Sequence, residues 1–174
     1  MRCAVVLISL ILAGCSAEPK GTPMTTDIAA SLDAFDNRRI YIQLDPATLR
    51  SIKDDDLEQA VFDYAASKLE GSLDREAQVV SSLPPGVRAL YLTWVVEAEV
   101  NNGGFNQYYY NTDGRFSAQA VDAFRFFGAD RHANLLREAN EIRANEEVEM
   151  AKFKDAATLE AFSESYEHTK LGPL

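Results

Sequence analysis

The side chains of this chain with the clearest chemical potential form one polar motif in its second half. Its members are Glu99, Asn102, Gly103, Gly104, Phe105, Gln107 and Asn111. Gln107 and Asn111 are four residues apart, so on a helix they share one face. A carboxylate beside two amide side chains offers both acceptors and donors, and such a cluster could hold a polar ligand.

The same motif also has a structural interpretation. Asn102-Gly103-Gly104 contains residues that tolerate positive φ, which a corner between two helices requires. Glu99 lies one turn before this corner and could accept hydrogen bonds from the free N–H groups of the next helix. The motif holds no His, no Cys and no activated Ser. The residues therefore favour a self-satisfied corner, and ligand binding stays the alternative.

No other pattern in the sequence indicates catalysis. Gly-x-Ser-x-Gly, His-Glu-x-x-His and phosphate-loop patterns are all missing. Glu97 and Glu99 are two residues apart and point to different faces of a helix, so they do not form a carboxylate pair. Asp54-Asp55-Asp56 lacks the spaced ligands and the glycine of a calcium loop and instead predicts a helix start. His132 and His168 are expected at the surface. We assign no catalytic residue, no metal site and no cofactor.

The N-terminus has the organisation of a lipoprotein signal peptide. Residues 4–13 form an apolar stretch interrupted only by Ser9, half the length that a membrane-spanning helix needs. Leu12-Ala13-Gly14-Cys15 follows and looks like a bacterial lipobox, in which the cysteine is acylated and becomes the new N-terminus. We expect a signal peptide over 1–14, a lipidated flexible tether over 15–26 and a folded domain over 27–174. The alternative is an ordinary secretory signal that happens to contain Cys15.

The charge of the chain restricts its partners. Lys and Arg number 17 against 27 Asp and Glu, a formal charge of −10. Removal of residues 1–14 takes away Arg2 and Cys3, which leaves a charge of −11 and Cys15 as the only cysteine. An acidic surface disfavours direct contact with a nucleic-acid backbone and permits a basic protein partner.

Glutamates are grouped on two of the expected helices. They are Glu138, Glu141 and Glu149 on a long helix, and Glu160, Glu164 and Glu167 on the last one. One interpretation is that these are the solvated faces of amphipathic helices. The other is that the two faces join into one negative field that attracts a basic partner.

The pattern of apolar residues predicts an all-α fold with a single compact multi-helix domain. No proline lies between Gly86 and Gly172, and apolar residues recur at helical spacing. Residues 40–44 alternate like a strand, but one strand cannot form a sheet, so we expect an extended connector. Helices are expected at about 46–52, 54–70, 84–101, 105–111, 117–127, from 130 onward with a bend or a new helix near Asn145, and at 156–167.

Four segments of the chain resemble a known bacterial family. They are 83–91 (LPPGVRALY), 99–108 (EVNNGGFNQY) with Asn111, 126–129 (FFGA) and 133–136 (ANLL). Together they are similar to the bacterial DNA-mimic protein family, the DMP-type helical domain, over about residues 57–165. The resemblance implies an all-helical domain of largely unknown function and allows a homodimer. The best-known role in that family is an acidic surface that imitates DNA and occupies a DNA-binding protein. The family has no established catalytic residues, so none are carried over.

These observations lead to one functional hypothesis. A protein exported with a lipid on Cys15 does not meet a transcription factor in the cytoplasm, so the resemblance bears on the fold more than on function. We expect a non-catalytic, acidic, membrane-anchored domain that acts through protein–protein contact in the cell envelope. Ser16, rather than Asp, follows Cys15, which favours the outer membrane facing the periplasm if the cell has two membranes. The alternative is an envelope enzyme or small-ligand-binding protein that uses Glu99, Gln107 and Asn111.

Overall fold

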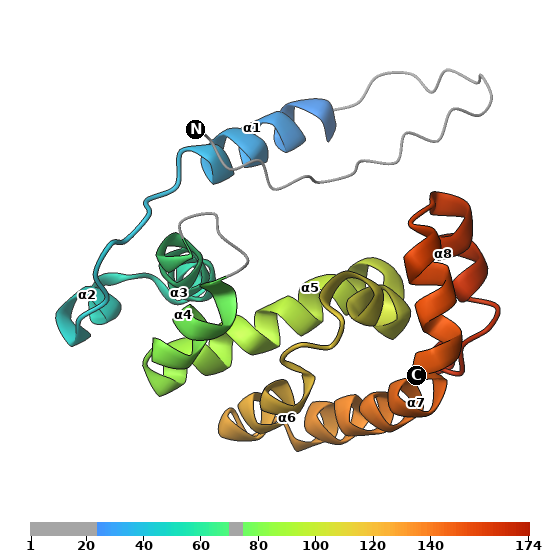
Figure 1. Ribbon diagram of the computed structural model, residues 1–174. Coiled ribbons are helices and arrows are strands. Elements are labelled where there is room, and N and C mark those ends of the chain that lie inside the picture. The colour runs from blue at the N-terminus through green and yellow to red at the C-terminus, as the bar shows by residue number, and fades with distance from the viewer. Residues whose placement is uncertain (1–23, 70–74) are drawn as a thin grey trace.

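The structure, a computed structural model, describes residues 24–69 and 75–174. Within these residues the chain forms eight helices and no strand, which confirms the all-α prediction (Figure 1). The expected signal peptide, Cys15 and most of the expected tether lie outside the described residues. The helices are α1 (Met24–Asp36), α2 (Pro46–Ser51), α3 (Asp54–Lys68), α4 (Glu76–Ser82), α5 (Pro85–Thr112), α6 (Ser117–Phe126), α7 (Asp130–Ala156) and α8 (Leu159–Ser165).

Helix α5 is the centre of the fold. It packs against α3, α6 and α7, and α7 in turn packs against α6 and α8. Tyr108 of α5 and Leu136 of α7 are among the largest fully buried side chains, and Ala120 and Ala139 allow α6 and α7 to approach closely. Figure 1 shows α5 crossing the middle of the molecule, with α3 and α4 at its first half and α8 beyond its second half.

Several helix ends form for the reasons that the sequence indicates. Asp45 Oδ1 accepts hydrogen bonds from the backbone N–H groups of Ala47 and Thr48, both at 2.8 Å, and Pro46 occupies the first helical position of α2. Asp54-Asp55-Asp56 fill the first turn of α3, where the helix dipole favours negative charge. Gly128, at φ +72°, follows the end of α6. Residues 40–44 form no strand and belong to the connection between α1 and α2.

No new helix begins near Asn145, because α7 is one helix from Asp130 to Ala156. A bend or a new helix was expected there because Glu146 interrupts the apolar stripe of the helix. In the structure, the Glu146 carboxylate accepts hydrogen bonds from the Thr169 hydroxyl at 2.7 Å and from the Lys170 backbone N–H at 3.0 Å. The C-terminal segment thus supplies partners for a half-buried carboxylate, so the helix does not have to break.

Other differences concern short or terminal helices. Helix α4 was not predicted. Helix α1 was not predicted either, and it begins at Met24, three residues inside the range expected for the tether. The last helix covers only Leu159–Ser165 instead of 156–167, and the side chain of Leu159 is exposed.

Candidate functional site

The polar motif forms a corner inside α5. Gly103 (φ −156°, ψ 26°) and Gly104 (φ 71°, ψ −175°) depart from helical geometry, whereas the residues before and after them are helical. The conformation of Gly104 is one that residues with a side chain rarely adopt. A Cβ atom on Gly103 would overlap the side-chain amide of Gln107. The corner therefore needs glycine at 104 for its backbone conformation and glycine at 103 because a side chain there would overlap Gln107.

Glu99 joins the two halves of α5 across this corner. Its Oε2 accepts hydrogen bonds from Gln107 Nε2 at 2.9 Å and from Asn111 Nδ2 at 2.8 Å. We expected Glu99 to accept backbone N–H groups, but it accepts side-chain amides instead. The second half of α5 presents these two amides on the face next to Glu99, because they are four residues apart.

The remaining motif residues have different environments. Phe105 is buried in the core, whereas Asn102 is exposed and lies outside these hydrogen bonds. Glu99 and Gln107 are half-buried and Asn111 is exposed. The carboxylate and amides therefore satisfy each other at the surface, which supports the structural interpretation of the corner.

Helix α8 holds the outer side of the corner. The Tyr166 hydroxyl donates to the Gly103 carbonyl oxygen at 2.8 Å, and burial, followed by the charge of Glu99, raises the pKa of this hydroxyl. Asn106 Nδ2 donates to Ser165 Oγ at 2.8 Å, and both side chains are buried. Sequence analysis missed Asn106, because nothing in the sequence connects it with a serine 59 residues away.

Two of the hollows in the described part of the chain lie near the central helix. The larger, of about 340 Å³, lies between the end of α4, the start of α5 and α6, with Arg88 and Asp122 among mainly apolar lining residues. The smaller, of about 10 Å³, has room for roughly one water molecule beside Arg143, whose Nη1 has no hydrogen-bond partner. Neither hollow is lined by Glu99, Gln107 or Asn111.

The acidic residues of α7 and of the α8 region meet at a histidine. Glu149 Oε1 lies 3.3 Å from His168 Nδ1, and Glu164 Oε1 lies 3.9 Å from His168 Nε2. The His168 ring also contacts Phe153 of α7, with 5.0 Å between ring centroids. Glu141 lies 3.5 Å from Arg137 of the same helix. All six glutamates singled out from the sequence are exposed: Glu138, Glu141, Glu149, Glu160, Glu164 and Glu167.

Metal binding and membrane crossing are two further possibilities for the described part of the chain. No group of three His, Cys, Asp or Glu side chains there is placed to hold a metal ion. No helix in the same residues has both the length and the apolar character needed to cross a bilayer.

Comparison with known proteins gives one match. A family model described as DMP19-like protein matches residues 81–173, which is more than half of the chain. The matched region begins at the end of α4 and includes the α5 corner, α6, α7 and α8. Neither the curated proteins nor the solved structures gave a match.

Proposed function

This chain belongs to the DMP19-like protein family, and we propose that it is a non-catalytic, lipid-anchored domain of the cell envelope that binds a basic protein through the acidic residues of α7 and α8. The family supports a DNA-mimic-like helical domain. The partner class, the anchor and the location are our proposal.

The observation that carries the proposal is the convergence of Glu149 and Glu164 on His168. Two acidic helix faces could have pointed away from each other, and each would then have been an ordinary solvated face. Instead, carboxylates from both sides lie within 4 Å of one imidazole ring. Charges this close add their fields, and a concentrated negative field would attract and orient a basic partner.

The anchor is supported by the sequence Leu12-Ala13-Gly14-Cys15 after a short apolar stretch. Processing at Cys15 would also make the domain more acidic, because it removes Arg2. A lipid anchor keeps the domain at the membrane, where a weak electrostatic partner is met repeatedly.

The partner proposal is tested by reversing the charge of four glutamates to lysine: Glu138, Glu141, Glu160 and Glu164. Crosslinking followed by purification from membranes should retrieve partners with the wild-type chain, and the reversed chain should lose them. Raising the salt concentration well above ~0.15 M should weaken the wild-type capture, because exposed charges are screened beyond about 8 Å.

The control is a second fourfold reversal on other elements, at Asp36, Asp55, Glu58 and Glu97. These acidic residues are also exposed and lie on α1, α3 and α5. The control variant should retain the partners, and circular dichroism should show the same helical signal in all three chains. Retrieval of the same partners at low salt by the α7–α8 reversal would mean that this acidic face serves only solvation.

The anchor is tested separately by Cys15→Ser. Metabolic labelling with a radioactive fatty acid should mark the wild-type chain and leave Cys15→Ser unlabelled. Equal incorporation in both chains would overturn the anchor and leave the partner proposal standing.

A further inference from the structure

Helix α1 presents an apolar face that is largely exposed in the described part of the chain. Ile28, Leu32 and Phe35 are 55%, 59% and 46% exposed. Their spacing of four and three residues places them on one side of the helix. Every side chain from 28 to 37 is exposed, and α1 lies along the outside of the molecule, apart from the helices around α5 (Figure 1). A grouped apolar face of this kind on an acidic protein indicates contact with something apolar.

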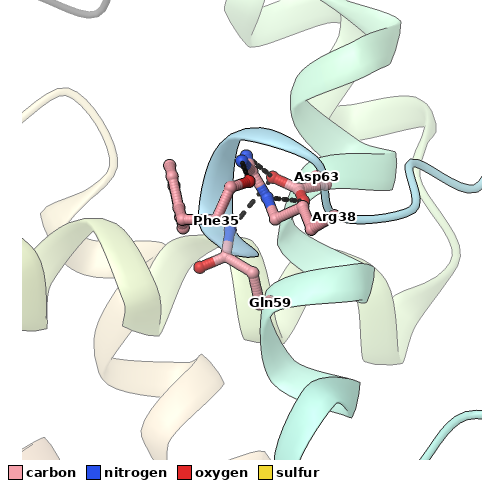
Figure 2. A network of polar contacts seen from close by, with 4 residues as sticks. All are labelled: Phe35, Arg38, Gln59 and Asp63. Carbon is pink, nitrogen blue, oxygen red and sulfur yellow. Dashed lines mark hydrogen bonds and ion pairs between the residues drawn. The ribbon is translucent and has the colours of Figure 1, made fainter. Parts of the chain in front are cut away.

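The C-terminal end of α1 is nevertheless firmly attached to the domain. Arg38 Nε and Nη2 donate to the two carboxylate oxygens of Asp63 on α3, at 2.6 and 2.9 Å (Figure 2). Gln59 Nε2 donates to the same carboxylate at 2.9 Å. Arg38 also donates to the Phe35 carbonyl oxygen at 2.6 Å and lies over the Phe35 ring.

This attachment is geometrically specific. Asp63 is 7% exposed, and an arginine that binds both oxygens of a nearly buried carboxylate fixes direction as well as distance. The C-terminal end of α1 is therefore held beside α3.

The position of α1 in the chain, close to Cys15, indicates what would cover its apolar face. Met24, the first residue of α1, comes nine residues after Cys15. Nine residues span at most about 30 Å when fully extended. If Cys15 carries a lipid, α1 is the first described helix after the membrane surface, and the bilayer is within its reach.

We propose that Ile28, Leu32 and Phe35 of α1 lie in the boundary between headgroups and acyl chains of the membrane that holds the lipid on Cys15. This inference rests on the proposed lipid anchor. A helix in this boundary buries its apolar face and keeps its polar residues in the headgroups. Exposed Asp33 and Asp36 lie on the rest of the α1 surface and favour a zwitterionic over an anionic lipid surface.

The consequence is an orientation for the whole domain. Figure 1 shows α1 on one side of α5 and the start of α7 on the other. With α1 on the bilayer and the Arg38–Asp63 contact holding its C-terminal end, the start of α7 faces away from the lipid. This part of α7 is then accessible to a protein partner.

The test uses the full chain, processed and acylated in cells and reconstituted into phosphatidylcholine vesicles. Leu32→Cys places a thiol on the apolar face, and Ala30→Cys places one on the far side of the same helix as a matched control. Both positions are exposed. In the processed chain Cys15 is blocked by lipid, so an environment-sensitive fluorophore reacts only with the new cysteine. We expect a blue-shifted emission from position 32 that lipids with a spin label in the acyl chain quench at least twofold. Position 30 should show neither effect.

Each other outcome overturns the proposal. A blue shift at position 32 that depends on protein concentration and is not quenched by spin-labelled lipid would mean that a second copy of the chain covers α1. An unshifted, unquenched probe would mean that the face stays in water. Mass spectrometry of the N-terminal peptide is measured in the same samples. An unmodified Cys15 overturns the anchor and with it this inference, whereas an acylated Cys15 with an unquenched probe overturns the α1 proposal alone.

Discussion

Replacing Gly104 with alanine tests whether the corner of α5 depends on backbone conformation. Gly104 has φ 71° and ψ −175°, a combination that is almost restricted to glycine. Nothing lies within 4 Å of the position that its Cβ would occupy, so steric overlap with neighbours contributes nothing. The whole effect should come from strain, and we expect Gly104→Ala to lower the free energy of unfolding by about 1–3 kcal/mol.

The measurement is urea unfolding of a chain that begins at Ser16, with circular dichroism as the probe of unfolding. For a slope of about 2 kcal/mol per M, the midpoint should fall by roughly 0.5–1.5 M with the slope unchanged. Gly86→Ala is the control, since Gly86 lies in the first turn of α5, also with nothing within 4 Å, and without a positive φ. This variant should be equal to the wild type or more stable by up to about 1 kcal/mol. A Gly104→Ala midpoint at or above that of the wild type would refute the strain argument.

Three further outcomes are expected from the same unfolding assay. Asn106→Ala and Ser165→Ala should each lower the free energy of unfolding by about 1–3 kcal/mol, because each leaves a buried polar partner unpaired. The double variant should lose less than the sum of the two single losses, and full additivity would show that the two side chains do not interact. Burial raises the pKa of Tyr108 to about 12, so above pH 10 the unfolded chain releases a proton that the folded chain keeps, and stability falls as the pH rises. Tyr108→Phe should remove roughly 1 kcal/mol of that loss at pH 11, and an identical pH dependence in both chains would contradict the assignment. Arg38→Ala should lower the free energy of unfolding by about 1–3 kcal/mol, because the nearly buried Asp63 loses its bidentate partner. Arg39 is the exposed neighbour, and Arg39→Ala should lower it much less. Equal losses in the two variants would argue against the contact.

The features that sequence analysis predicted depend on neighbouring residues. The cap at Asp45, the start of α3 at Asp54 and the corner at Gly103-Gly104 each follow from the properties of a few adjacent side chains. The hydrogen bonds of Glu99 were only partly predicted. Its place beside the corner was clear, but whether backbone or side-chain amides approach it depends on how far the corner turns the second half of α5.

The features that it missed depend on partners far along the chain. Glu146 looked like a break in α7, because its partners are Thr169 and Lys170 of the C-terminal segment. Asn106 was indistinguishable from the polar residues around it until Ser165 was placed beside it. Contacts of this range come from tertiary packing, which local spacing does not contain.

The burial of the C-terminal segment has a consequence for the order of folding. Leu171 is 3% exposed within the core, and the residues just before it bind Glu146, while Ser165 and Tyr166 hold the α5 corner. The helices α3, α5, α6 and α7 can meet as they are synthesised, since each packs on a near neighbour in sequence. The core, however, stays open until residue 171 has left the ribosome. During synthesis the nascent chain is therefore an incomplete bundle until this segment emerges, and its closure comes after α3, α5, α6 and α7 have been made.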